Sequence, residues 1–263
     1  MSDLYSLLTS AGSDSTIPPT MRTIFLADAH LRSPDDLNYR MLLRFLRGLE
    51  GITETLFIMG DLFDFWIGFP SHPFRQYDPL LDALLALKRS GCRLVYFEGN
   101  HDFHLGSIFY ERLAAEVHTR PAIRTVQGRR LFLCHGDQIN RADHGYRLLR
   151  LVLRNRLAAA TVRHVPPALA LCIRERLQHA SRSSYGSKSV RWDYGRIIRD
   201  FARSVHRMGC TGLVTGHFHL AFCEELDCGS FTILSLGEWM ERLTYGEMVA
   251  GRLRLSEYLP DRP

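Results

Sequence analysis

Short apolar runs recur along the chain and are separated by polar or amphipathic stretches. Six of them have strand length and predict β-strands at Thr23–Ala27, Thr55–Met59, Arg93–Glu98, Arg130–Cys134, Gly212–Thr215 and Phe231–Leu236. Leucines at helical spacing between the early runs predict helices over Tyr39–Leu49 and Pro79–Lys88. Near-continuous apolar strands that alternate with amphipathic helices are typical of an α/β fold whose sheet is covered.

The segment 139–209 departs from this rhythm. It contains no convincing strand, and helical patterns occur over Tyr146–Ala160 and again after Pro166 and Pro167. We therefore expect one domain over residues 21–263 with a helical insertion at about 139–209. Residues 1–20 are rich in Ser and Thr and lack the features of a signal peptide, so we expect a poorly ordered leader there.

The same segment carries an excess of positive charge. It holds fifteen Arg or Lys against four Asp or Glu, a net charge of +11, whereas the rest of the chain carries −6. A basic segment of this size favours an anionic partner such as phosphates, nucleic acid or a lipid surface. The six cysteines form no C-x-x-C pair and no uncharged apolar stretch reaches 18 residues, so the sequence favours a cytosolic protein without a membrane span.

Residues that can bind metals follow five of the six predicted strands. The five segments are Asp28-Ala29-His30, GDLFD with Asp61 and Asp64, GNHD with Asn100 and His101, HGD with His135, and GHFH with His217 and His219. Ligands of α/β sheets bind at the carboxyl ends of strands. Side chains alternate along an extended chain, so Asp28 and His30 are expected to face the same side, as are His217 and His219. We therefore expect these residues to converge on one site.

The ligand inventory of this site is two carboxylates, one amide oxygen and four imidazoles. This set suits two divalent borderline metals such as Mn, Fe or Zn. A bridging carboxylate could hold two ions roughly 3.5–4 Å apart, a geometry that activates water and stabilises phosphoryl oxygens. Each segment alone has a plainer interpretation, since Asp-x-His can form a turn and a lone His135 can be structural. Their occurrence in order at five strand ends favours the metal site.

The ordered motifs D-x-H, G-D-x-x-D, G-N-H-D, H before G, and G-H-x-H resemble those of the calcineurin-like metallophosphoesterases, over residues 22 to about 240. The resemblance implies a two-sheet β-sandwich flanked by helices, with a dinuclear site. It implies one metal bound by Asp28, His30 and His219, and a second bound by Asn100, His135 and His217. Asp61 would bridge the two ions, for which Mn²⁺ is our first choice and Fe or Zn the alternatives.

The resemblance also implies a role for His101, which adjoins Asn100 but exceeds the ligand count. In many members of the family this histidine protonates the leaving oxygen or stabilises the charged phosphate. The last Asp of G-D-x-x-D, here Asp64, orients it, because a carboxylate partner fixes the tautomer of a histidine. A hydrogen-bonding role behind the ligands is the alternative for His101. Asp102 is expected to be structural, turning the loop through backbone contacts.

Longer stretches narrow the resemblance. The segments GDLFDFWIG, GNHDF, HGDQINRADHGYR, GSKS, GHFH and LGEW, together with the basic insertion, are similar to the UDP-2,3-diacylglucosamine hydrolases of lipid A biosynthesis. Those enzymes cleave the pyrophosphate of UDP-2,3-diacylglucosamine into UMP and 2,3-diacylglucosamine 1-phosphate at the cytoplasmic membrane face. The resemblance implies a helical lid that holds the acyl chains. It also implies substrate contacts at Asn100, His101, Asp143, Ser181, Lys188 and His217.

Two departures concern the substrate more than the metals. The chain has His101 where the best-known group of these hydrolases has Arg, and ADAHL where SDLHL is more usual. Three hypotheses remain open: a UDP-2,3-diacylglucosamine hydrolase peripheral to the inner membrane, another metallophosphoesterase such as a nucleotide phosphodiesterase or nuclease, and a non-catalytic scaffold. The complete ligand set disfavours the scaffold. The Arg-rich segment has no interleaved aromatic platform, so no nucleic-acid partner is expected, and no protein partner is evident.

Overall fold

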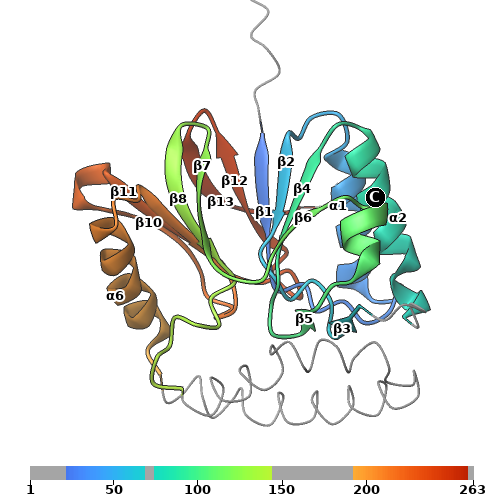
Figure 1. The fold of residues 1–263 in the computed structure, drawn as a ribbon, viewed down its shortest axis with the longest axis horizontal. Coiled ribbons are helices and arrows are strands. Elements are labelled where there is room, and N and C mark those ends of the chain that lie inside the picture. The colour runs from blue at the N-terminus through green and yellow to red at the C-terminus, as the bar shows by residue number, and fades with distance from the viewer. Residues whose placement is uncertain (1–21, 69–73, 144–191, 260–263) are drawn as a thin grey trace, which may run out of the picture.

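Two mixed β-sheets form the centre of the molecule in a computed structural model that describes residues 22–68, 74–143 and 192–259 (Figure 1). The first sheet has six strands in the order β13-β12-β1-β2-β4-β6. Their bounds are Arg252–Glu257, Thr244–Val249, Thr23–Leu26, Thr55–Ile58, Arg93–Phe97 and Glu116–His118. The four strands from β1 to β6 are parallel, and β12 and β13 extend the sheet in antiparallel pairing.

The second sheet has five strands in the order β10-β11-β9-β8-β7. Their bounds are Ala221–Leu226, Phe231–Leu236, Gly212–Thr215, Arg129–Cys134 and Ala122–Val126. The central strands β11, β9 and β8 are parallel, and each edge strand pairs antiparallel with its neighbour. A third, two-stranded pairing joins β3, Trp66–Ile67, to β5, Asp102–Phe103.

The two sheets pack against each other through an apolar layer. Strand β1 shows why: Phe25 and Ala27 point into the layer between the sheets, whereas Ile24 and Leu26 belong to a second core on the opposite face. Successive side chains of a strand point to opposite faces, so a strand that is apolar throughout must be covered on both. The layer between the sheets also contains Phe57, Val95, Leu133, Val214 and Leu234.

Among the described residues, three helices cover the outer faces of the sandwich. Helices α1, Leu37–Gly48, and α2, Asp78–Arg89, lie side by side over the six-stranded sheet, and α6, Tyr194–Arg207, lies over the five-stranded sheet (Figure 1). Helix α6 buries Ile198, Ala202 and Val205 on one stripe. Asp193 caps its start by accepting a hydrogen bond of 2.9 Å from the Arg196 amide. Short helical turns occur at Arg75–Tyr77, Ile108–Arg112 and Asp227–Gly229.

The structure confirms the six predicted strands and the two predicted early helices to within about two residues at each end. The α/β class with covered sheets is also confirmed. The two helical patterns of the insertion, and the leader at 1–20, lie outside the described residues. The end of the predicted insertion is described, and there α6 belongs to the layer that covers the second sheet. In the part of the chain that the structure describes, no helix is both long and apolar enough to cross a membrane.

Candidate metal centre

The predicted ligands lie in loops just past the carboxyl ends of strands from both sheets. Strands β1, β2 and β4 of the first sheet lead into Asp28, His30, Asp61 and Asn100, and strands β8 and β9 of the second lead into His135, His217 and His219. Parallel strands end at a common edge, so the loops of the two packed sheets meet there.

The local backbone differs from the expectation of an extended chain. The positive φ angles are 52° at Asp28, 42° at His30, 54° at Asp61, 70° at His217 and 52° at His219. Non-glycine residues rarely adopt this left-handed region, and such outliers cluster at functional sites. The paired residues therefore converge because each loop curls back at its polar residues, and the expectation of simple strand alternation was wrong.

One cluster joins Asp28, His30 and His219. The Oδ1 atom of Asp28 lies 3.9 Å from Nε2 of His30 and 3.6 Å from Nε2 of His219. Its other oxygen, Oδ2, accepts a hydrogen bond of 2.8 Å from the His217 amide. One carboxylate oxygen is thus held by the backbone while the other faces two imidazoles. These three residues form a group whose geometry could hold a metal ion.

A second cluster joins Asn100, His135 and His217. The Oδ1 atom of Asn100 lies 3.0 Å from Nε2 of His135 and 2.9 Å from Nδ1 of His217. The other ring nitrogen of His135, Nδ1, lies 2.8 Å from the carbonyl oxygen of Met59. An Nδ1–H that donates to this carbonyl directs Nε2 toward the cluster, as in histidines that bind metals.

Asp61 lies between the two clusters. Its Oδ2 atom is 3.7 Å from Nε2 of His30 in the first cluster and 3.4 Å from Nε2 of His135 in the second. Its Oδ1 atom accepts a hydrogen bond of 2.9 Å from the His101 amide. Asp61 is therefore the carboxylate whose position suits the predicted bridge.

Two glycines allow the loops to approach this closely. A Cβ atom at Gly99 would lie 2.1 Å from Oδ1 of Asp61, and one at Gly216 would lie 2.4 Å from Oδ2 of Asp28. Real Cβ atoms do not approach other atoms so closely. The glycines of G-N-H-D and G-H-x-H are thus required by the space that the ligand carboxylates occupy.

The buried polar atoms of the site fit divalent metal ions. The Asp28 Oδ1 and His30 Nε2 atoms are buried without a hydrogen-bond partner among the described residues. Buried polar groups are costly unless they are satisfied, so a carboxylate oxygen and a ring nitrogen left open side by side suit a shared cation. Carboxylate, amide and imidazole donors together suit borderline divalent metals.

Electrostatics prepares three of the imidazoles to bind a cation. Burial lowers the pKa of His217 to about 3 and that of His219 to about 4, and the charge of His135 acts in the same direction on both. Burial also lowers the pKa of His30 well below its usual value. These rings are therefore neutral at pH 7, which is the form that binds metals.

The remaining charges pair within the site. Burial works against charging His135, but the charge and hydrogen bond of Asp61 outweigh it and raise the pKa of His135 to about 10. Burial likewise opposes the charge of Asp61, yet His135, His101 and His30 hold its pKa well below the usual range. Burial raises the pKa of Asp28 well above that range. The site thus concentrates titratable groups whose charges a bound cation would rebalance.

His101 lies beside the first cluster, and its ring contacts that of His30 edge-on at a centroid distance of 4.7 Å. Its Nδ1 atom is 2.9 Å from the main-chain oxygen of Asp64. A carboxylate oxygen of Asp64 also lies within 4.8 Å of ring nitrogens of His30 and His101. Asp64 Oδ1 is 3.1 Å from Nε of Arg32. The hydrogen bond that orients the ring is therefore made by the backbone of Asp64, a contact that the motif could not specify.

Asp102 confirms its predicted structural role. It is fully buried, and its carboxylate accepts hydrogen bonds from the amides of Gly99, Asp61 and Leu62 at 2.8, 3.0 and 2.7 Å. The Tyr96 hydroxyl donates to Oδ2 at 2.6 Å. Burial and the charge of Asp61 raise the pKa of Asp102 to about 6, so it is a carboxylate at pH 7. It holds the loops that carry Asp61 and Asn100 together.

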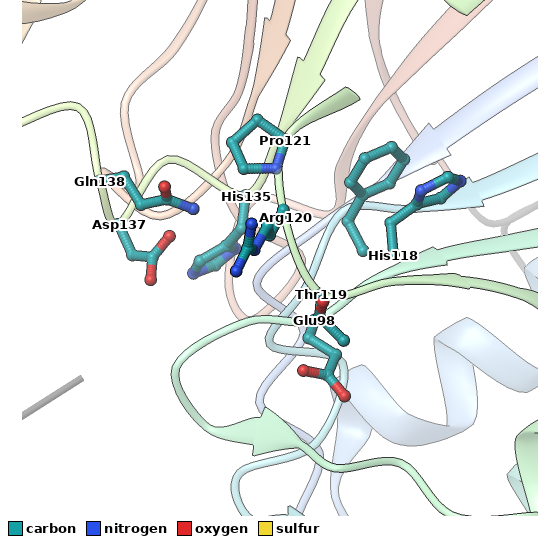
Figure 2. Close-up of a pocket in the computed structure, with 9 residues that line it drawn as sticks. Glu98, His118, Thr119, Arg120, Pro121, His135, Asp137 and Gln138 are labelled. Atoms are coloured by element: carbon teal, nitrogen blue, oxygen red, sulfur yellow. The ribbon is translucent and has the colours of Figure 1, made fainter. Parts of the chain in front are cut away.

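A pocket opens beside His135 (Figure 2). It is lined by the end of β4, the loop between β6 and β7, and the loop after β8. The lining residues are Phe97, Glu98, His118, Thr119, Arg120, Pro121, His135, Asp137 and Gln138. Of these, His135 alone was a predicted site residue.

The predicted substrate contacts are only partly described. Asp143 is half-buried, its amide is 3.4 Å from the carbonyl oxygen of Asn140, and its charge acts on Tyr194 at the start of α6. Ser181 and Lys188 lie outside the described residues.

Known proteins resemble the chain over most of its length. The model of the calcineurin-like phosphoesterase family matches residues 21–221. A "UDP-2,3-diacylglucosamine hydrolase" of Pseudomonas syringae pv. tomato is 30% identical over 82% of this chain and 87% of its own length. A protein of the same name from Aeromonas salmonicida is 28% identical over 90% of this chain and 93% of its own. Together with the His and Asp clusters, these matches identify the chain as a metallophosphoesterase, a hydrolase that belongs to the calcineurin-like phosphoesterase family.

Proposed function

We propose that this metallophosphoesterase hydrolyses UDP-2,3-diacylglucosamine to UMP and 2,3-diacylglucosamine 1-phosphate with two divalent metal ions, Mn²⁺ being the first candidate. The observation that carries the proposal is the similarity to relatives of that name over 82–90% of the chain. The gathering of all seven candidate ligands at one edge of the sandwich supports the chemistry.

The ligands divide between two metal positions in this proposal. Asp28, His30 and His219 would hold one ion, Asn100, His135 and His217 would hold the other, and both would share Asp61. When bound, the ions supply an activated water and neutralise charge on the phosphoryl oxygens. In this proposal Asn100 and His217 would also contact the substrate phosphate, since both belong to the second cluster.

His101 acts on the leaving group. Its half-buried ring lies beside His30, and the Asp64 carbonyl oxygen fixes Nδ1. An Nδ1–H that donates to this carbonyl leaves Nε2 as the atom that contacts the phosphate or exchanges a proton with the leaving oxygen. Asp64 therefore contributes by orienting the His101 ring.

In this proposal the segment around 139–209 binds the lipid part of the substrate, and Asp143, Ser181 and Lys188 are its proposed contacts. A substrate with two acyl chains resides in a bilayer, so the proposal includes peripheral binding at the cytoplasmic face of the inner membrane. The net charge of +11 in that segment suits both an anionic head group and a lipid surface.

Release of UMP from UDP-2,3-diacylglucosamine by the purified protein with Mn²⁺ tests the proposal. UDP-N-acetylglucosamine serves as the matched substrate without acyl chains. Each buried CH₂ stabilises a complex by about 0.8 kcal/mol, so a few enclosed methylenes already give a more than tenfold preference in kcat/KM. Equal kcat/KM for the two compounds would replace the lipid assignment with a general phosphodiesterase.

A further inference from the structure

The pocket beside His135 shares this residue with the candidate metal centre. His135 lines the pocket (Figure 2). Its Nε2 atom also lies 3.0 Å from the Asn100 amide oxygen in the second cluster. A group attached to a phosphoryl group held at that cluster could therefore extend into this pocket. The residues that face the pocket can distinguish substrates by the group attached to the reacting phosphate.

Arg120 is the cation of this pocket that is exposed and makes no hydrogen bond or ion pair with any described residue. Its neighbours differ: His118 lies 3.0 Å from the Glu116 carboxylate, and Arg124 forms an ion pair with the same carboxylate. Pro121 comes directly after Arg120 and restricts its backbone to an extended conformation. The loop thus presents an unengaged guanidinium to solvent at the pocket.

The two acidic residues of the pocket are buried and interact with groups inside the protein. Glu98 is 5% exposed and accepts a hydrogen bond of 3.3 Å from the Leu105 amide. Asp137 is 3% exposed, and its charge acts on His135 and His217. Neither acid is paired with Arg120 in the described structure. The charge that a ligand in this pocket meets first is therefore positive.

We propose that Arg120 binds the second phosphoryl group of a diphosphate substrate, the one that is not held at the metal centre. The planar guanidinium can donate two parallel hydrogen bonds to phosphate oxygens, which the compact ammonium of lysine cannot. Thr119 and Gln138 add polar groups for the part of the substrate beyond that phosphate. This inference rests on the proposed function only in assuming a diphosphate, and not in assuming a lipid.

The experiment compares UDP with UMP, which differ by one phosphoryl group. Calorimetric titration at a fixed free Mn²⁺ concentration gives the two Kd values for the unaltered protein and for Arg120→Ala, Arg120→Lys and Arg124→Ala. We expect the unaltered protein to bind UDP more tightly than UMP. Arg120→Ala should reduce that ratio by roughly ten- to hundredfold, the range for hydrogen bonds to a charged group.

The other variants separate charge from geometry. Arg120→Lys should restore the ratio only in part, and Arg124→Ala, an engaged arginine four residues away, should leave it unchanged. Metal content and thermal unfolding check that each variant is folded and loaded. An equal loss of UDP and UMP binding in Arg120→Ala overturns the inference, as does an unaltered protein without preference for UDP.

The result is separable from the proposed function. A protein that shows the Arg120-dependent preference but does not hydrolyse UDP-2,3-diacylglucosamine retains this inference for another diphosphate. A protein that hydrolyses the lipid substrate without that preference retains the proposed function and loses the inference.

Discussion

Two buried carboxylates at the same edge of the sandwich, Asp28 and Asp102, are satisfied in different ways. Asp102 receives hydrogen bonds from several backbone amides and from a tyrosine hydroxyl. Asp28 receives one amide hydrogen bond at Oδ2, while its buried Oδ1 has no hydrogen-bond partner in the described residues and faces His30 and His219. A carboxylate that the backbone satisfies holds the fold, whereas one left open among imidazoles is prepared for a cation.

We expect the largest loss of activity when Asp61 loses its charge, because this carboxylate contacts both clusters of the metal centre. We expect Asp61→Asn to reduce metal content and to lower kcat by more than the roughly 10²–10⁴-fold contribution of a positioned acid–base group. Elemental analysis and turnover of a phosphodiester measure both effects. Asp227→Asn, which alters an exposed carboxylate bonded to His206, is the matched control. Full metal content with normal turnover in Asp61→Asn would reject the bridging position.

His101 is predicted to act in catalysis at the metal centre without binding a metal ion. Its amide donates to Asp61 and its ring to the Asp64 carbonyl oxygen, so His101→Ala removes the ring and keeps the amide. We expect kcat to fall by about 10²–10⁴-fold while the metal content is retained. If the variant instead loses metal in proportion to its activity, His101 belongs among the ligands.

The comparison of Asp28 with Asp102 also shows which features the sequence could predict. Apolar runs covered on both faces made the six strands readable, and the polar residues just past them identified the seven candidate ligands. The left-handed backbone of Asp28 and His217 was not predictable, because period-two alternation assumes an extended chain. The donors around Asp102 come from several segments, so tertiary packing alone brings them together.

Helix α6 and the outer strands were missed for different reasons. Helix α6 has a clear stripe of apolar residues at helical spacing, including Ile198, Ala202 and Val205, but it lies within the segment assigned to the insertion, where helices were predicted only over the two earlier patterns. Strand β13 carries charged residues at its exposed positions, such as Arg252 and Arg254. Arg120 showed no motif at all, and its place in the pocket depends on the loop between two short strands.

Loss of the Asp102 carboxylate should lower the free energy of unfolding more than it changes the chemistry of the metal centre. Asp102→Ala orphans the amides of Asp61 and Leu62 and the hydroxyl of Tyr96, whereas the Gly99 amide keeps its hydrogen bond to the main-chain oxygen of residue 102. Each orphaned buried donor costs about 1–3 kcal/mol, so we expect a loss of about 3 kcal/mol or more in the free energy of unfolding. Denaturant unfolding of the metal-free protein gives this value. A loss below about 1 kcal/mol, the lower end of that range, would show that the loops do not depend on Asp102.

The smallest effect concerns an orphaned atom that lies away from any metal ligand. The Thr53 hydroxyl oxygen is buried without a hydrogen-bond partner among the described residues, as Asp28 Oδ1 is, but it lies before the amino end of β2, whereas Asp61 lies past the carboxyl end. In the described part of the chain, the groups of His and Asp residues that could hold a metal ion all lie past the carboxyl ends of strands. Removing an unsatisfied buried hydroxyl should be neutral or stabilising by up to about 1 kcal/mol, so we expect Thr53→Val to keep metal content and kcat and to unfold at the same or a slightly higher denaturant concentration.

Thr244→Val is the matched control for Thr53→Val, because the Thr244 hydroxyl is buried and satisfied. It donates to the Leu236 carbonyl oxygen at 2.7 Å and accepts from the Glu238 amide at 3.0 Å, and its loss should destabilise by about 1–3 kcal/mol. Loss of metal in Thr53→Val would mean that an orphaned polar atom indicates the metal centre even at a distance. Retention of metal would restrict that inference to orphaned atoms that imidazoles surround.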